Sequence, residues 1–250
     1  MKFSKLKLTA PIDWKAATTV FVALCMLLAL GFWQLERAGE KRRKQKTIET
    51  RLTADPIAIE EIRRIFPESL DFRHVFLQGS YLSEKSILLV DRFYLGRQGY
   101  EVLTPVKLVS TDQIVVVSRG WTALEPGAGR PSTPGTPQGI VRLNGTIHVT
   151  GSRSFFVDRP LRDEQWPMHL RHLNLEKIDK RFALPVFPYV VRLDEAMPGV
   201  LSRYWTIPDT NPERSTSYAL QWFAMALLLF LVALIKSTNI AEIFRSKAGK

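Results

Sequence analysis

The sequence predicts an α+β membrane protein in which two terminal transmembrane helices flank one mostly antiparallel β domain with short helices. Two observations lead to this fold class. Each end of the chain holds an uncharged stretch, 16–35 and 215–235, that is long enough as a helix to cross the roughly 30 Å hydrocarbon core of a bilayer. Between them, short segments rich in β-branched residues are separated by turn residues, as in a sheet of short strands.

The first apolar stretch is predicted to be an uncleaved anchor that follows a basic cytoplasmic tail, 1–15. It is too long for a signal peptide and has no small-residue cleavage site at its end. Trp33 lies where an indole ring favours the headgroup region. Gln34, just inside the apolar boundary, can bond a headgroup, its own domain or a partner helix, and composition favours the headgroup. Beyond Arg37, the charged run 41–46 is predicted to continue the helix into water.

The middle of the chain, 36–214, is predicted to be one extracytoplasmic β-rich domain. Asp55 and Pro56 predict the N-cap and first position of a short helix, and Asn174 predicts the cap of another. Residues 96–99 are predicted to form a turn, and the proline-rich stretch 122–138 a long irregular loop. The predicted strands are Val75–Leu77, Ser86–Val90, Tyr100–Leu108, Gln113–Val117, Ile140–Val149 with a break at Asn144-Gly145, and Val186–Leu193.

The second apolar stretch is predicted to return the chain to the side from which it started. Tyr218 and Trp222 stand one helical turn apart at its entry, as an interfacial aromatic belt would place them. The Lys and Arg residues that flank the two spans are equally numerous on both sides. The tail 236–250, however, is more basic than the segment before the second span, and long domains translocate largely regardless of charge. We therefore expect both termini in the cytoplasm.

The charge distribution favours lipid over nucleic acid as the partner of the basic residues. The chain has 35 Lys and Arg residues against 24 Asp and Glu residues, a formal net charge of +11. The two tails together hold eight of the basic residues and two of the acidic ones. Basic tails beside apolar helices are typical of contact with the anionic headgroups of a bilayer. We expect no nucleic-acid partner.

Signatures of an enzyme or a metal centre are missing from the sequence. It has no Walker A loop, GxSxG or HExxH motif, and its single cysteine, Cys25, excludes an intramolecular disulfide and a cysteine cluster. His169 and His172 have the spacing to share a helical face, but no acidic residue stands at a matching position. We therefore favour surface or hydrogen-bonded histidines over a metal site. Neither apolar stretch contains a histidine that could ligate haem.

Two arginines directly follow predicted strands. Arg92 comes after the segment that ends at Val90, and Arg119 stands within Ser118–Trp121, after Val117. Such arginines pair with carboxylates or carbonyls inside a domain, or they grip an anionic ligand such as a propionate. We favour internal pairing because an unpaired buried charge is rare.

Taken in order, several motifs of this chain resemble the surfeit locus protein 1 family. They are Gly31–Leu35 with Arg37 and Lys41, Gly79–Tyr81, Gly99–Pro105, Val117–Trp121, Trp166 and Tyr218–Phe223. The residues that we single out as structural or partner-contact positions are Trp33, Gln34, Arg37, Arg92, Tyr100, Arg119, Gly120, Trp121, Tyr218 and Trp222.

The resemblance implies a non-enzymatic assembly factor for haem-copper cytochrome c oxidase. Such a factor assists the delivery or retention of haem a while the catalytic subunit matures, so its partners are that subunit and the proteins of haem a synthesis. The domain would face the periplasm or the mitochondrial intermembrane space. The leader is too short and too poor in arginine for a mitochondrial transit peptide, which indicates a bacterial plasma membrane.

One position departs from the family pattern. Members implicated in haem binding carry a histidine three positions before the tyrosine of the second span, and that position is Ser215 here. A serine hydroxyl is a poor ligand for haem iron, so we assign no cofactor-binding, catalytic or metal residue. A membrane-anchored periplasmic enzyme and a ligand sensor are the alternative functions. The short tail 236–250 leaves no room for the output domain that a sensor needs.

Overall fold

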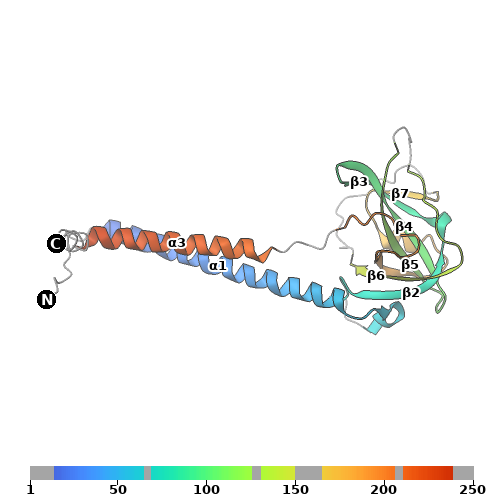
Figure 1. Ribbon diagram of the computed structural model, residues 1–250, viewed down its shortest axis with the longest axis horizontal. Helices are drawn as coiled ribbons and strands as arrows, with labels where there is room; N and C mark the ends of the chain where they lie inside the picture. Colours follow the sequence, from blue (N-terminus) through green and yellow to red (C-terminus); the bar gives the residue numbers. More distant parts are fainter. Residues whose placement is uncertain (1–13, 65–68, 126–130, 150–164, 206–210, 239–250) are drawn as a thin grey trace. The chain divides into compact units, whose positions relative to one another are not determined.

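The computed structural model describes residues 14–64, 69–125, 131–149, 165–205 and 211–238. The chain divides into a helical unit, 1–47 with 208–250, and a β-rich unit, 48–207 (Figure 1). Two apolar helices flank a β-rich unit that carries only short helices, so the predicted fold class is confirmed. The predicted basic tails lie almost wholly outside the described residues.

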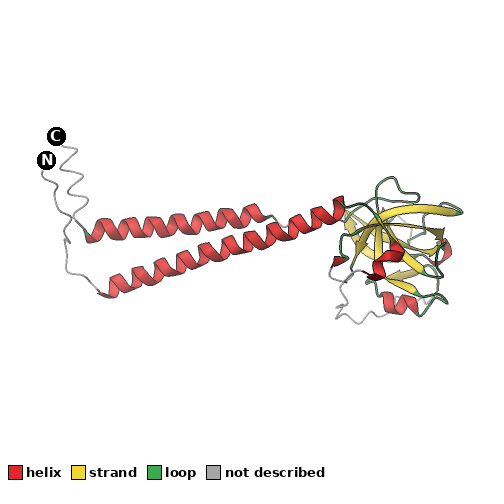
Figure 2. Ribbon diagram, turned by 90° about the horizontal axis from the view of Figure 1, so that it is seen from below, coloured by secondary structure: helices red, strands yellow, loops and turns green. Residues whose placement is uncertain are grey.

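The helical unit is built from α1 (Trp14–Thr53) and α3 (Pro212–Ser237), and both are long and apolar enough to cross a membrane. The two views show them side by side (Figure 1 and Figure 2). As predicted, α1 continues without a break through the charged run 41–46. Asn211 caps α3 by accepting a hydrogen bond from the backbone N–H of Arg214 at 3.1 Å.

One face of helix α1 is less exposed than the rest, and the residues on this face recur alternately three and four positions apart. This spacing is the heptad pattern of a helix that packs along a partner helix. A methyl group built on Gly31 would lie 2.5 Å from the ring of Phe223, so the helices approach closely here. The face consists of Val20, Leu24, Leu27, Gly31, Gln34, Ala38 and Lys41 on α1, and the buried residues of α3 are Ser215, Ala219 and Ala226. Small side chains allow this approach.

The β-rich unit is a closed barrel with additional strands on its edges (Figure 2). Its ring runs β2 (His74–Tyr81), β6 (Ile140–His148), β8 (Val186–Leu193), β5 (Ile114–Ala123), β4 (Arg97–Leu108) and back to β2. Within the ring only β5 and β8 are parallel, in keeping with the mostly antiparallel prediction. Outside it, β1 (Ile57–Ala58) pairs with β2, β3 (Ile87–Tyr94) with β4, and β7 (Met168–Leu170) with β3.

Strand β4 changes its neighbour on one side, and this change closes the barrel. It pairs with β3 as far as Leu103 and with β2 from Val106 onwards. Pro105 stands between these two residues, where its missing N–H removes no bond from either ladder.

Two hydrophobic clusters lie on opposite faces of the barrel wall. The inner cluster takes every second residue of the ring strands, including Val75, Val117, Ile147 and Val191. The outer cluster takes the residues between them on β4, β5 and β8, and it is covered by β7 and by α2 (Leu175–Asp179). Since both faces of β5 are buried, its sequence reads as an unbroken apolar run.

Three local predictions need correction. Pro56 does not open a helix, because Ile57 and Ala58 pair with β2 and a 3-10 helix, η1, begins only at Ile59 and ends at Arg64. Gly145 does not break β6; its missing side chain makes room for the carbonyl of Arg192 on β8. The turn between β3 and β4 lies at Leu95-Gly96, which both have positive φ, and Gly99 belongs to β4.

The second helix prediction is confirmed, because the Asn174 side chain accepts a hydrogen bond from Lys177 N at the start of α2. A further 3-10 turn, η3, spans Ser83–Lys85. The predicted irregular loop begins later than expected, because β5 extends to Ala123. Its residues 131–138 have no regular structure, and 126–130 lie outside the described residues.

Candidate functional site

The helix residues singled out in the sequence lie on different faces of the pair. Trp33 is exposed, and Arg37 is exposed with an ion pair to Glu40 at 3.4 Å. Gln34 lies half-buried on the face of α1 that carries the heptad pattern. On α3, Tyr218 is exposed beside the guanidinium of Arg214. Trp222 is half-buried.

Ser215 lies in a polar contact between the two helices. It is 4% exposed, and its hydroxyl accepts a hydrogen bond from Lys41 Nζ at 3.0 Å. Next to it, Arg42 donates to the hydroxyl of Thr216 at 3.1 Å. These two bonds tie the first turn of α3 to α1. The hydroxyl is therefore already engaged as an acceptor, and the residues at this position do not fit an axial ligand of haem.

The histidines of the chain all lie in the β-rich unit. His74 is in β2, His148 in β6 and His169 in β7, and His172 follows that strand. His169 and His172 therefore share no helical face, which corrects the arrangement considered from their spacing. No group of metal-binding side chains occurs in the part of the chain that the structure describes.

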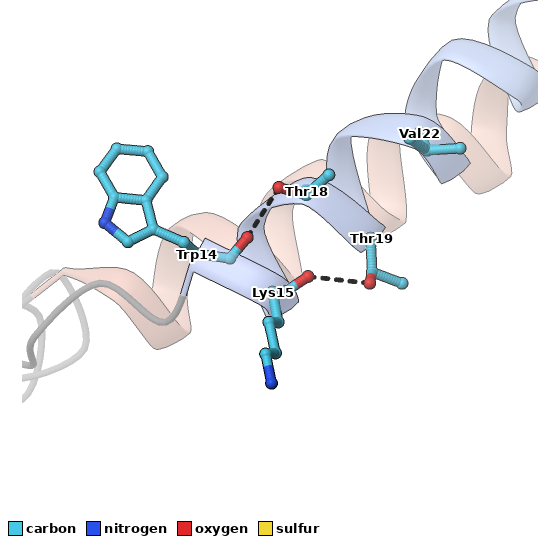
Figure 3. Close-up of a pocket in the computed structure, with 5 residues that line it drawn as sticks. All are labelled: Trp14, Lys15, Thr18, Thr19 and Val22. Carbon is cyan, nitrogen blue, oxygen red and sulfur yellow. Dashed lines mark hydrogen bonds between the residues drawn. The ribbon is translucent and has the colours of Figure 1, made fainter.

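A shallow hollow lies on the first turns of α1 (Figure 3). It is lined by Trp14, Lys15, Thr18, Thr19 and Val22. The two threonine hydroxyls donate to the carbonyls of Trp14 and Lys15, four residues earlier in the helix. The side chains of Trp14 and Lys15 point in different directions (Figure 3). No set of polar groups converges on this hollow, so it is not a candidate site.

Arg119 lies inside β5, not after it, and is 1% exposed. Its guanidinium donates three hydrogen bonds to backbone carbonyls: Nε to Gly199 at 2.6 Å, Nη1 to Pro134 at 2.9 Å and Nη2 to Gly135 at 2.6 Å. These bonds join β5 to two segments that are distant in the sequence. They satisfy the buried charge with carbonyl oxygens of the domain itself.

The residues after Arg119 hold the segment 199–205, which we call the return segment. Trp121 N donates to Ser202 O at 2.6 Å, and Ser202 N donates to Trp121 O at 3.2 Å. Gly120, which precedes Trp121 in the chain, has a φ of +124°, and a methyl group built on it would lie 2.6 Å from Ser202 O. Glycine is thus required both by the backbone conformation and by the close approach of the return segment.

Two further motif residues of the β-rich unit also bond to backbone. Arg92 lies within β3 at a bulge, where its Nη2 donates to Arg171 O at 3.0 Å and its carbonyl accepts from Trp121 Nε1 at 3.1 Å. The hydroxyl of Tyr100 donates to Ser132 O at 2.8 Å and so orders the loop 131–138.

A row of polar residues crosses four neighbouring strands on the outer face of the barrel. His74 pairs with Thr146, Thr146 with Arg192, and Arg192 with Ser118, on β2, β6, β8 and β5 respectively. We call these four residues the polar row. Each of the four residues is a direct neighbour in the chain of a residue of the inner cluster. Because successive side chains of a strand point to opposite faces, the polar row lies on the outer face.

Glu101 on β4 extends the polar row and is only 8% exposed. One carboxylate oxygen accepts from the Ser118 hydroxyl at 2.5 Å, and the other accepts from the hydroxyl of Tyr204 at 2.7 Å. Burial, together with the Glu101 carboxylate, raises the pKa of Tyr204 well above its ordinary value, so the phenol keeps the proton that it donates. The return segment is thereby fixed over the row.

A groove of about 410 Å³ opens beside the polar row. Its lining residues are Leu52, Phe72, His74, Thr146, Ile147, Arg192, Asp194, Glu195, Arg203 and Trp205. The guanidinium of Arg192 lies 5.4 Å from the centre of the Trp205 ring. Burial lowers the pKa of Arg192, and the nearby Glu101 carboxylate opposes this shift. A guanidinium is basic enough to carry its charge at neutral pH.

Sequence reasoning missed the groove, although it named a motif that holds one of the segments lining it. Ser118–Trp121 was singled out, and this motif holds the return segment that carries Trp205. Arg192 had the same signal as Arg119, an arginine after a run of valines, but its neighbours come from distant strands. Among the described lining residues, no hydroxyl is bonded to His74, so the groove shows binding groups and no nucleophile with its base.

In comparisons with known proteins, a single family model matches most of the chain. The model of the SURF1 family matches residues 21–227, which include most of both apolar helices and the whole β-rich unit. A SURF1-like protein of Rickettsia felis is 27% identical over 242 residues, which cover 92% of this chain and 100% of that protein. A SURF1-like protein of Rickettsia conorii is 26% identical, covering 86% of this chain and 88% of its own. An uncharacterized SURF1-like protein of Mycobacterium bovis is 24% identical, with 86% and 80% covered.

Proposed function

This chain belongs to the SURF1 family, known broadly as assembly factors of cytochrome c oxidase, and from that premise we propose that it is a non-enzymatic membrane factor for the assembly of a haem-copper oxidase. The observation that carries the proposal is the continuity of the family match. It runs from α1 through the barrel into α3, so it covers the architecture as a whole and not a single domain.

The finer proposal is that the chain assists the delivery or retention of haem a while the catalytic subunit matures. The partners would be that subunit and the proteins of haem a synthesis. The polar contact between Lys41 and Ser215 supplies no imidazole, so the helix pair assists through protein contacts and not as an axial ligand. Gln34 supports such a contact, because a half-buried amide in an apolar helix is available to a polar group of a neighbouring helix.

We further propose that the chain spans a bacterial plasma membrane twice, with both termini in the cytoplasm and the barrel in the periplasm. Both helices have the length and hydropathy of membrane spans. The charge bias around the second span supports this orientation. The Rickettsia and Mycobacterium relatives support a bacterial membrane.

The decisive experiment deletes the chain from its host and records the reduced-minus-oxidised spectrum and the oxidase activity of the membranes. We expect the haem a signal of the oxidase to fall and to return when the full chain is supplied in trans. The b-type cytochromes in the same spectrum serve as the internal control. A deletion strain with unchanged haem a oxidase would refute the assembly role.

A second experiment tests the partner. The tagged full chain, extracted in mild detergent, is expected to copurify the catalytic subunit from cells in which oxidase maturation is under way. A tagged α1 segment without the barrel and α3 serves as the control for retention by detergent micelles alone. Equal recovery of the subunit with both baits would contradict the proposed contact.

A further inference from the structure

We propose that the groove beside the polar row binds a carboxylate group carried on a small apolar molecule, with the Arg192 guanidinium as the partner of the anion and Trp205 as the adjoining wall. This inference goes beyond the assembly role and does not depend on it. It rests on four observations about the described residues of the β-rich unit.

The first observation is that the other charges of the groove are paired among themselves. Arg203 Nη1 lies 3.1 Å from a carboxylate oxygen of Glu195. His74 Nε2 lies 2.5 Å from a carboxylate oxygen of Asp194, a hydrogen bond that becomes an ion pair when the imidazole is protonated. Of the charged lining residues that the structure describes, Arg192 is thus the one whose charge has no ion-pair partner in the groove. Within the described lining, Arg192 is therefore the guanidinium that has no carboxylate at ion-pair distance, although the Glu101 carboxylate behind it acts on its charge.

The second observation concerns the carboxylate behind Arg192. The Glu101 carboxylate lies in the same row and raises the pKa of Arg192 against the effect of burial. Its two oxygens, however, already accept hydrogen bonds from Ser118 and Tyr204. Among the described residues, the Arg192 guanidinium donates no hydrogen bond; it stacks on Trp205 and interacts electrostatically with Glu101 and Asp71. A half-buried guanidinium without acceptors is unusual, and a bound acceptor would satisfy it.

The third observation is that the unsatisfied buried atoms of the lining are donors. Trp205 Nε1 and Arg203 Nε are buried and have no hydrogen-bond partner among the described residues. No lining residue has an unsatisfied buried side-chain oxygen in the described part of the chain. The complementary ligand therefore brings acceptors, and a planar carboxylate can accept two parallel bonds from a guanidinium.

The fourth observation is the apolar part of the lining. Leu52, Phe72 and the ring of Trp205 adjoin the polar groups, and the volume of about 410 Å³ lies in the range of small-molecule sites. Asp194 and Glu195 stand at the same groove. A dianion such as a phosphate monoester would face these carboxylates with only one free cation, so a monoanion on an apolar body is the better match.

The test uses the purified full chain in a nonionic detergent and isothermal titration with 4-phenylbutyrate as the probe. The neutral amide of the same acid and inorganic phosphate are titrated in parallel. We expect saturable binding of the carboxylate and at least about tenfold weaker binding of the amide, because the amide lacks the charge. We expect no saturable binding of phosphate.

The variants are Arg192→Gln and, as the matched control, Arg142→Gln. Arg142 also stacks on an aromatic ring, Phe76 at 4.8 Å, but it is exposed and does not line the groove. Arg192→Gln is expected to weaken binding about 10- to 100-fold, the effect of losing a charge-assisted hydrogen bond. Arg142→Gln is expected to leave it unchanged. Trp205→Phe, which replaces the indole by a smaller aromatic ring without an N–H donor, is expected to weaken binding several-fold.

Three outcomes would overturn the proposal: no saturable binding of the carboxylate, equal affinities for the carboxylate and its amide, or equal effects of the Arg192 and Arg142 substitutions. Tighter binding of phosphate than of the carboxylate would also overturn it, in favour of a phosphate site. If Arg192→Gln does not fold, the comparison of carboxylate with amide on the wild type and the Trp205→Phe variant decides the question.

Discussion

Substitution of Gly120 by alanine tests how the barrel holds the return segment. The added methyl group would lie 2.6 Å from Ser202 O and 3.0 Å from the carbonyl carbon of Leu201, both of which are backbone atoms. The φ of +124° is also unfavourable for any residue with a Cβ. The matched control is Gly96→Ala, since Gly96 has a φ of +74° but nothing within 4 Å of the added methyl group.

The expected magnitude follows from two terms. A residue with a Cβ in the conformation of Gly120 costs about 1–3 kcal/mol in backbone strain. The displaced return segment also loses the hydrogen bonds from Trp121 N to Ser202 O and from Leu201 N to Arg119 O, at about 1 kcal/mol each. We therefore expect Gly120→Ala to lower the free energy of unfolding by about 3–5 kcal/mol. Gly96→Ala is expected to lower it by about 1–2 kcal/mol, from the left-handed conformation alone.

Thermal unfolding of the full chain in detergent, followed by tryptophan fluorescence, measures the difference between the two variants. For a domain of this size about 1 kcal/mol corresponds to roughly 2–4 °C, so Gly120→Ala should lower the Tm by about 6–20 °C. If the two variants unfold within about 2 °C of each other, the close approach of the return segment contributes nothing and the reasoning is wrong.

Three further predictions address the helix pair, the barrel and the haem question. Gly31→Ile should lower the oxidase level in a complemented deletion strain, because the added side chain would meet the ring of Phe223. Gly39→Ile should not lower it, because only the end of a flexible arginine side chain lies within 4 Å of the added Cβ. Equal oxidase levels with the two variants would count against close helix packing. Burial raises the pKa of Tyr81 from 10.0 to about 12, so the stability held below pH 10 should be lost as the pH rises from 10 towards 12. Tyr81→Phe should flatten this part of the pH–stability curve, and an unchanged curve would show that Tyr81 is not the group responsible. Because Ser215 offers a hydroxyl that is already bonded, the purified chain should carry no stoichiometric haem Soret band; a band abolished by substitution of His169 or His172 would contradict this.

The fold class could be predicted because its signals are local in the sequence. The uncharged stretches 16–35 and 215–235 each predict a helix by their composition alone. The alternating segments between them predict strands. The errors arose where a local signal has two structural meanings. Asp55-Pro56 fits a helix start as well as the approach to a strand, and Asn144-Gly145 fits a turn as well as a tight strand crossing. Pairing with β2 and β8, which lie far along the chain, decided both cases.

The groove was not predicted, because none of the residues singled out in the sequence lines it and its lining comes from distant segments. The motif around Arg119 and Gly120 stood out in the sequence, and it proved to hold the return segment. The sequence does not show which carbonyls satisfy Arg119, because Pro134, Gly135 and Gly199 come from two other segments.

The sequence by itself determined the two apolar helices, the short strands between them and the family to which the chain belongs, because each of these depends on residue types in a fixed order. Only the tertiary structure decided that His74, Thr146, Arg192 and Ser118 form one row. Their neighbourhood depends on the register of four strands, and a shift of one residue would have turned each side chain to the other face. The strands close into a barrel, so the same register that buries Val117 and Val191 inside also turns Ser118 and Arg192 outward, where Ser118 bonds to Glu101 and Arg192 lines the groove.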